Sequence, residues 1–141
     1  PMVMLFRLYS GEEPSSEELA RAKRLVLVYP TWWGGMPGRL LEWFQFCFAR
    51  WIDGDAALED SPLREVRRLT AVTTHGATSI VNRMQGEPGR QLLQRTGTRL
   101  CAQDVEFEWI PLYGSDKSDD ETRQKFLTKV TSLMSSSEDQ S

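Results

Sequence analysis

The chain has 141 residues, of which 40% are hydrophobic, and its 17 basic and 20 acidic side chains give a formal net charge of −3. This size and composition predict one globular domain that is large enough to bury a core. The charge balance gives no electrostatic footprint for nucleic acid or an anionic membrane, so neither is expected as a partner. No apolar run approaches the roughly 20 residues that span a bilayer. We expect a cytoplasmic or mitochondrial protein rather than a secreted one.

The cysteine and histidine content argues against metal or disulfide chemistry. Cys47 and Cys101 lie in apolar surroundings without C-x-x-C spacing, and His75 is the only histidine. We therefore expect two buried free thiols and no metal site. The acidic stretches "EEPSSEE" and "DKSDDE" are interpreted as helix starts, because as metal sites they lack a convincing ligand geometry.

In chain order, the first third predicts two strands and two helices. The apolar run Met2–Tyr9 indicates a strand, and "PSSEELARAKR" indicates a helix that is capped by Ser15 or Ser16. Leu25–Pro30 is continuously aliphatic, which is typical of a parallel strand covered on both faces. The segment from Pro37 to about Trp51 predicts a helix whose apolar positions go nearly all the way round.

The remainder predicts two further strand and helix pairs. A polar excursion at 53–65 leads to a strand at about Leu69–Thr73 and a small-residue loop, and Gly89–Leu100 indicates a helix. "VEFEWIPLYG" alternates like a strand, and "SDDETRQKFLTKVTSLM" indicates a helix capped by Ser118. Residues 135–141 are expected to form a disordered tail.

This alternation predicts an α/β fold with a parallel sheet. In such sheets a ligand lies outside the carboxyl ends of the strands. The loops expected at that edge are "PTWWGGMP", "THGATS" and "YGSDKSDD". Because a tight turn needs glycines but not adjacent indoles, Trp32 and Trp33 predict a flat, apolar ligand there. On the residues alone, the alternative is that the indoles pack at a domain or subunit surface.

Three stretches resemble one family. "VYPTWWGGMPGRLLEWF" resembles the signature of flavodoxin-like NAD(P)H dehydrogenases and quinone reductases, "LTAVTTHGA" resembles their Thr-Thr-Gly-Gly loop, and "WIPLYGSDKSDDETRQKFL" resembles their last strand and helix. The resemblance runs from about Leu8 to Val130. It implies a flavodoxin-like three-layer sandwich, usually dimeric, in which FMN or FAD accepts hydride from NAD(P)H and passes electrons to a quinone or similar acceptor.

The resemblance also implies a set of site residues. By position, the isoalloxazine would be lined by Pro30, Thr31, Trp32, Trp33 and Gly34, and its pyrimidine edge would be approached by Thr73, Thr74, His75 and Gly76. His75 replaces a family glycine and is a weak candidate for catalysis. Where family members place a Tyr and a His that assist electron transfer, this chain has Val81 and Glu87 or Pro88, so no proton donor is evident.

The family's first strand and its Ser-rich phosphate loop have no clear counterpart. We therefore expect the domain, 1–134, to be incomplete at its amino terminus. Because that strand is central in the order 2-1-3-4-5, its absence would leave two strands with unpaired inner edges. Either residues are missing, another polypeptide fills the gap, or the sheet is rearranged. "LYSGEEPSSEEL" is an alternative phosphate loop, which its glutamates disfavour.

Two functions of different classes follow. The first is an NAD(P)H:quinone-type oxidoreductase that works through a bound flavin. The second is a non-catalytic subunit derived from this family and built into a larger assembly. The helix "LEWFQFCFARW" is unusually apolar, so we expect a homodimer or a permanent hetero-assembly through Leu40–Trp51.

Overall fold

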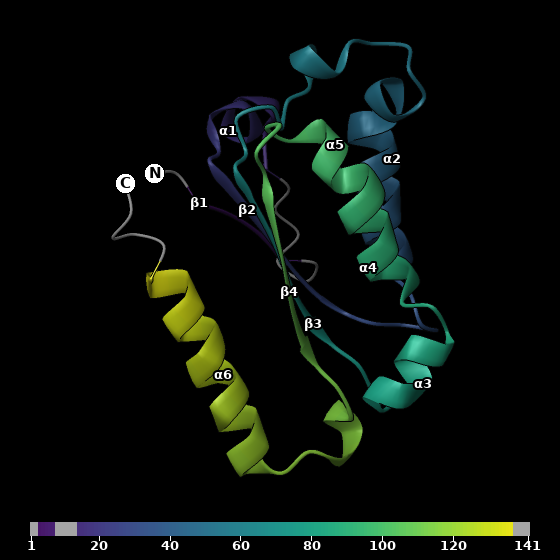
Figure 1. Cartoon of the computed structure of the whole chain (residues 1–141), viewed down its shortest axis with the longest axis vertical. Coiled ribbons are helices and arrows are strands. Elements are labelled where there is room, and N and C mark those ends of the chain that lie inside the picture. The colour runs from purple at the N-terminus through teal and green to yellow at the C-terminus, as the bar shows by residue number, and fades with distance from the viewer. Residues whose placement is uncertain (1–2, 8–13, 137–141) are drawn as a thin grey trace.

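The computed structural model describes the backbone of residues 3–7 and residues 14–136 in full. Its centre is a four-stranded parallel sheet in the order β1-β2-β3-β4, with helices on both sides (Figure 1). The strands are β1 Val3–Arg7, β2 Arg24–Pro30, β3 Arg68–Thr74 and β4 Glu106–Leu112. This architecture confirms the expected flavodoxin-like three-layer α/β fold.

Six α-helices and short turns connect and cover the described strands. They are α1 Ser16–Arg21, α2 Gly38–Ile52, α3 Ser79–Met84, α4 Pro88–Leu92, α5 Thr98–Leu100 and α6 Asp120–Ser135. A π-helical turn, Leu93–Gly97, joins α4 to α5, so the helix expected over this stretch is continuous. Two 3₁₀ turns cover Leu58–Asp60 and Ser115–Lys117.

The N-terminal cap predicted for α1 is observed, whereas the cap predicted for α6 is not. Of the two predicted caps, Ser15 or Ser16, it is Ser15 that caps α1, in a reciprocal capping box with Glu18. The prediction that Ser118 caps α6 is wrong, because the Asp119 carboxylate accepts from the Thr122 N–H at 2.8 Å. Ser118 instead donates to the Ser115 carbonyl at 2.8 Å and closes the preceding turn.

The sheet has no gap. β1 pairs directly with β2, with Val3 opposite Arg24 and Arg7 opposite Val28. The expectation of two unpaired inner edges is therefore wrong for the sheet that the described strands form. The physical reason is that an inner edge presents a row of backbone donors and acceptors that need partners, which the neighbouring strand supplies.

The two faces of the sheet are covered unequally. One face packs on α2, α4 and α5 and carries a large buried cluster that includes Leu27, Phe48 and Leu69. The other face packs on α6 through a small cluster of Val26, Val72 and Ile110. The prediction that β2 is covered on both faces holds only in part, because Val28 is 38% exposed.

Helix α2 is buried on one side only, although its apolar composition predicts burial nearly all the way round. Its buried side chains, Leu40, Trp43, Phe44 and Phe48, face the large cluster. Phe46 lies on the outward side and is 92% exposed, and Leu41 is partly exposed. The homodimer or hetero-assembly expected through this helix stays a prediction.

Candidate functional site

Three loops meet at the carboxyl edge of the sheet, as the sequence predicts. The backbone N–H of Thr31 donates to the Thr74 carbonyl at 2.7 Å, which ties the loop after β2 to the end of β3. The N–H of His75 donates to the Leu112 carbonyl at 2.8 Å, and the N–H of Ser115 donates to the His75 carbonyl at 2.8 Å. This edge therefore brings residues that are distant in sequence into one small region.

The outermost feature is the turn Trp32–Gly35. Trp32 and Gly35 exchange backbone hydrogen bonds of 3.0 and 2.9 Å. Within the turn, Trp33 has φ of 51° and Gly34 has φ of 78°. Trp32 is 53% exposed and Trp33 is fully exposed, at 105% of its reference area. A bulky residue in the left-handed region costs on the order of 1–3 kcal/mol, and such strain concentrates at ligand sites.

The turn lies along the segment that joins α3 to α4 (Figure 1). A Cβ added to Gly34 would come within 2.9 Å of Gln85 Oε1. A Cβ on Gly35 would lie 3.9 Å from Pro88 Cγ. Gln85 and Pro88 therefore lie beside the two glycines of the turn.

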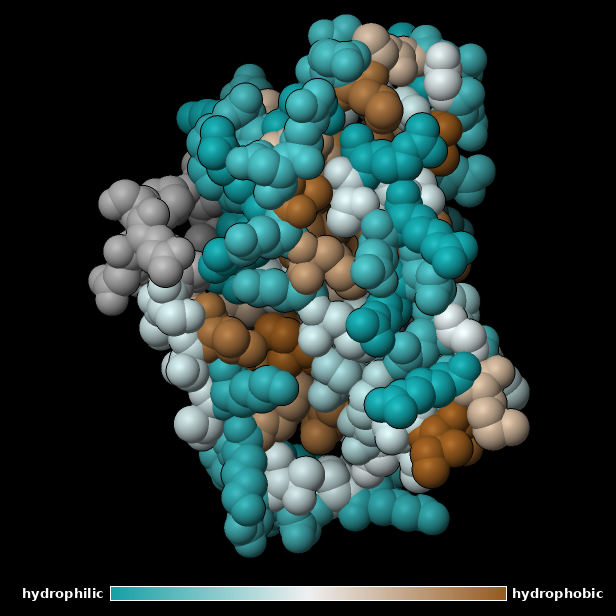
Figure 2. Space-filling view, in the orientation of Figure 1, coloured by the Kyte–Doolittle hydropathy of each residue, from teal (hydrophilic) through white to brown (hydrophobic). Residues whose placement is uncertain are grey.

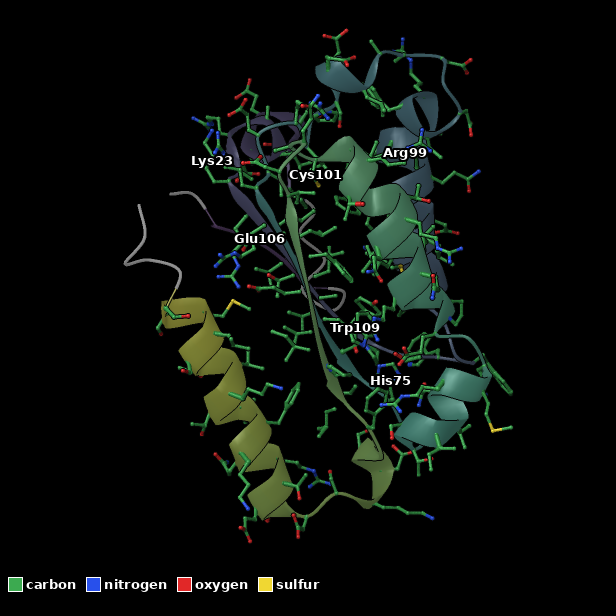
Figure 3. All side chains as sticks on the ribbon, viewed as in Figure 1. Lys23, His75, Arg99, Cys101, Glu106 and Trp109 are labelled. Carbon is green, nitrogen blue, oxygen red and sulfur yellow. The ribbon has the colours of Figure 1, made fainter. Side chains whose placement is uncertain are left out.

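Beneath the turn, His75 is locked in a buried polar network (Figure 3). Its Nε2 lies 2.7 Å from Thr73 Oγ1 and 3.4 Å from Thr31 Oγ1, and its Nδ1 lies 2.9 Å from Asn82 Oδ1. Asn82 Nδ2 donates to the Ala77 and Thr78 carbonyls, which fixes the amide orientation. The Asn82 oxygen must therefore accept, so His75 carries its proton on Nδ1 and Nε2 is an acceptor.

The environment keeps His75 neutral. Its side chain is buried, and this burial lowers its pKa despite the opposing effects of the Asn82 hydrogen bond and the Glu87 charge. Because the Nε2 lone pair already faces two threonine hydroxyls, the ring is placed to hold the loops together.

A second polar cluster adjoins this network. The Tyr113 ring lies 4.8 Å from the His75 ring between centroids, and the Tyr113 hydroxyl donates to Glu87 Oε1. Arg90 Nη1 donates to Glu87 Oε2 at 3.2 Å. Burial opposes ionisation of Glu87, but the hydrogen bonds from Tyr113 and Arg90 and the Arg90 charge outweigh it and lower the pKa of this carboxyl. Burial and the Glu87 hydrogen bond raise the pKa of Tyr113.

The structure divides the sequence-predicted site residues into three groups by their exposure. Trp32, Trp33 and Gly76 are exposed, whereas Thr73 and His75 are buried and turned into internal hydrogen bonds. The others, Pro30, Thr31, Gly34 and Thr74, are intermediate. Sequence reasoning missed Asn82 and Tyr113. For Tyr113, the one indication in the sequence was its position in the loop "YGSDKSDD", which was expected at the carboxyl edge of the sheet. No pattern in the sequence indicated Asn82.

The space enclosed behind the turn is small. A slot of about 10 Å³, lined by Tyr29, Thr31, His75, Glu87 and Arg90 among others, has room for about one water molecule. A flavin ring therefore does not fit inside the slot.

The outer face of this edge is open and carries groups of the kinds that could hold such a ring. It offers exposed indoles as apolar walls, and the N–H groups of Gly76 and Ala77 donate to no acceptor in the part of the chain that is described. The alternative phosphate loop falls mostly on residues 8–13, outside the described residues.

The opposite edge of the sheet holds a larger, open groove of about 590 Å³. It is lined by Arg64, Arg99, Cys101 and Val105 among others, and Figure 3 shows Arg99 and Cys101 far from His75. Burial raises the pKa of the Cys101 thiol to about 12, so it is not a nucleophile at neutral pH.

Residues 3–7 and 14–136 lack two features that would indicate other functions. They contain no cluster of three or more acidic, histidine or cysteine side chains placed to hold a metal ion. They also contain no helix with the length and apolar character needed to cross a bilayer.

Comparison with known proteins agrees with this geometry. The chain is similar to the Smu.1420 protein from Streptococcus mutans UA159, with a TM-score of 0.64, 22% identity, and coverage of 84% of this chain and 62% of that one. It is similar to an NAD(P)H:quinone oxidoreductase from Methanothermobacter marburgensis, with a TM-score of 0.59, 23% identity, and coverage of 80% and 55%. The chain thus spans less than two thirds of the length of these two structures. No curated protein sequence matches it significantly. Residues 9–133 match the model of one sequence family, and the chain therefore belongs to that family, Flavodoxin_2, whose fold is flavodoxin-like.

Proposed function

We propose that the protein is a flavin-dependent NAD(P)H oxidoreductase of the quinone reductase type, using FMN or FAD. One observation carries this proposal: two exposed indoles stand on a strained turn at the carboxyl edge of a flavodoxin-like sheet. Ligands of open α/β sheets bind at this edge, and a flat apolar ring is the partner that such walls suit. The solved NAD(P)H:quinone oxidoreductase with a similar fold supports the reaction class.

In this proposal the edge loops hold the ring. Trp32 and Trp33 would form its apolar walls, and the N–H groups of Gly76 and Ala77 would hydrogen-bond its polar edge. The Asn82 amide holds the Ala77 carbonyl, and through His75 it anchors this loop to β3. These donors are therefore oriented before a ligand arrives, which lowers the cost of binding it. When bound, the flavin supplies the hydride chemistry.

Tyr113 is the group that we assign to hold a proton near this site. Its raised pKa keeps the phenol protonated at neutral pH, whereas the lowered pKa of Glu87 keeps that carboxylate ionised as acceptor. The Nε2 lone pair of His75 is engaged by Thr73, so we assign His75 a positioning role rather than the catalytic role considered from the sequence.

An absorption spectrum of the purified protein tests the proposal. After addition of FMN or FAD and removal of unbound flavin, we expect a stoichiometric band near about 450 nm that NADH or NADPH bleaches. Trp32→Ala should weaken flavin binding, whereas Phe46→Ala, which removes an exposed aromatic ring from α2, should not. A folded protein that binds no flavin would contradict the proposal and leave the non-catalytic subunit as the alternative.

A further inference from the structure

The open groove of about 590 Å³ at the edge opposite the indoles, here called the Arg64 groove, is lined by a cation without an anionic partner. Among the described residues, the buried or half-buried arginines are Arg24, Arg64, Arg68 and Arg90. Three of them pair with a glutamate: Arg24 at 2.8 Å, Arg68 at 2.7 Å and Arg90 at 3.2 Å. Arg64 alone of the four forms no ion pair with a described carboxylate. Because a guanidinium withdrawn from water needs a partner to offset its lost hydration, Arg64 indicates an anion that the described residues do not supply.

The fold holds Arg64 in place at the wall of the groove. Its backbone N–H donates to the Ser61 carbonyl at 3.0 Å, and the flanking Leu63 and Val66 are buried in the large cluster. Its Nη1 donates to the Cys101 carbonyl at 2.7 Å. A guanidinium carries several N–H donors in a rigid fork, so most of the donors of Arg64 remain for a ligand. They are oriented before a ligand arrives, which lowers the cost of binding one.

The groove has the size and the mixed lining of a small-molecule site. Its volume lies within the range of roughly 300–1,000 Å³ that is usual for such sites. Its walls come from residues 58–64 and from residues 94–105, which are distant in sequence. The apolar lining residues are Leu58, Ala102 and Val105, and the uncharged polar ones are Gln94, Thr98 and Gln103. Figure 2 shows this mixture at the upper end of the molecule, where apolar atoms are flanked by hydrophilic side chains.

The charged side chains that line the groove are positive on balance. Arg99, which is exposed and forms no ion pair within the described residues, lines it together with Arg64. Glu59 is the one acid among the lining residues, and it forms no ion pair with either arginine. Glu65 and Asp104 lie next to lining residues in sequence but pair with other basic side chains. The balance of two cations and one anion favours a ligand of low negative charge over a highly charged one.

We propose that the Arg64 groove binds a small organic anion, a carboxylate or phosphate with an apolar body. Arg64 and Arg99 would hold the anionic group, because a guanidinium fork matches both carboxylate and phosphate with paired hydrogen bonds. Leu58 and Val105 would contact the apolar body. Figure 3 shows Arg99 far from the candidate site at the carboxyl edge, so binding here needs neither a flavin nor the proposed oxidoreductase function.

Nuclear magnetic resonance titration of the full chain tests the site without flavin. The probes are phenyl phosphate and benzoate, which carry the two anionic groups on an aromatic body, and inorganic phosphate, which lacks that body. We expect saturable shifts confined to residues 58–66 and 94–105, including the Nε–H signal of Arg64. Inorganic phosphate should bind about tenfold more weakly than phenyl phosphate, because it cannot contact the apolar lining residues.

Two variants and a matched control assign the binding to the arginines. Arg64→Lys keeps the charge but loses the planar fork, and Arg99→Gln removes the second charge, so each should weaken phenyl phosphate binding about tenfold. Arg99→Gln leaves the hydrogen bond from Arg64 to Cys101 intact, so it tests the site even if Arg64→Lys does not fold. Arg95→Gln is the control and should bind like the wild type, because Arg95 is an exposed arginine that does not line the groove.

The outcomes separate this site from the proposed function. Absence of saturable shifts with all three probes, shifts around other arginines, or an equal loss in Arg95→Gln would overturn the proposal. Tighter binding of phenyl phosphate than of benzoate would support the phosphate class, and the reverse order would support the carboxylate class. A protein that binds these probes but no flavin keeps the Arg64 groove and loses the oxidoreductase, and one that binds flavin but no probe does the opposite.

Discussion

The two faces of the sheet differ in the interactions that they make: one is packed with apolar side chains, and the other carries many paired charges. Among the described residues, the face under α2, α4 and α5 belongs to a cluster of seventeen buried side chains, whereas the α6 face has a cluster of three. The amino-terminal part of the α6 face instead carries charges, with Arg24 donating to Glu108 at 2.8 Å and to Thr70 at 3.2 Å. Figure 3 shows Glu106 on this side as well. Packing therefore stabilises one face, and paired charges occupy much of the other.

The largest expected effect tests the apolar face. Phe48 is fully buried, and its ring lies 5.2 Å from that of Trp43 in an edge-to-face arrangement. Phe48→Ala should lower the free energy of unfolding by about 3–5 kcal/mol through lost burial and the cavity left behind. Phe126→Ala on α6 should cost less than half as much, because its ring is only half-buried. Denaturant unfolding measures both, and equal losses would contradict the unequal division of stability.

On the α6 face, removal of one carboxylate from a buried ion pair should lower the free energy of unfolding. Glu108→Gln leaves Arg24 buried without its carboxylate, and because Glu108 is itself partly solvated we expect a loss of about 2 kcal/mol. Glu106→Gln is the matched control. It breaks the 2.7 Å pair with Arg68, but Glu106 is largely exposed, so the cost should stay below about 1 kcal/mol. Urea denaturation at low ionic strength distinguishes the two, and similar costs would contradict a buried role for Arg24.

The pH dependence of stability should report the network around His75. Because the folded pKa lies below the ordinary value of 6.5, the unfolded chain takes up a proton first as the pH falls. This contribution is complete above pH 6.5 and is lost as the pH falls toward the folded pKa, by at most about 1.4 kcal/mol per pH unit.

The variant His75→Gln should show a flatter stability profile over this range. The lowered pKa of Glu87 makes a separate contribution that is complete above its ordinary value of 4.5 and is lost as the pH falls below it, and both proteins should show this loss. Equilibrium unfolding at a series of pH values measures both profiles. Parallel curves for the two proteins would mean that His75 titrates alike in the folded and unfolded states.

Local patterns predicted the framework of the fold. The aliphatic runs placed β2 and β3 to within one residue at each end, and the Ser15 cap followed from the acidic residues after it. The alternation of Val105, Phe107 and Trp109 correctly indicated one buried face, since all three pack on the large cluster. These features depend on neighbouring residues alone.

The missed features depend on contacts across the fold. The sequence analysis predicts no element over α3, because its six residues give little periodicity and its Thr78 cap and Asn82 anchor act only once β3 is in place. The pairing of β1 with β2 depends on how the strands are ordered in the sheet, which no local sequence pattern indicates. Tyr113 and Glu87 lie 26 residues apart, so no local pattern indicated that they would meet.

The smallest expected effect concerns the slot behind the turn. The Tyr29 hydroxyl is buried and has no hydrogen-bond partner among the described residues, and burial raises its pKa. Tyr29→Phe should therefore leave the free energy of unfolding within about 0.5 kcal/mol of the wild type, or raise it, because an unsatisfied buried hydroxyl is removed.

Tyr113→Phe is the comparison, and it should cost about 1–2 kcal/mol because that hydroxyl donates to the ionised Glu87. Thermal or denaturant unfolding measures both variants. If Tyr29→Phe costs as much as Tyr113→Phe, then the Tyr29 hydroxyl has a partner, which the size of the slot limits to about one water molecule. That result would make the interior behind the indoles polar and hydrated rather than dry.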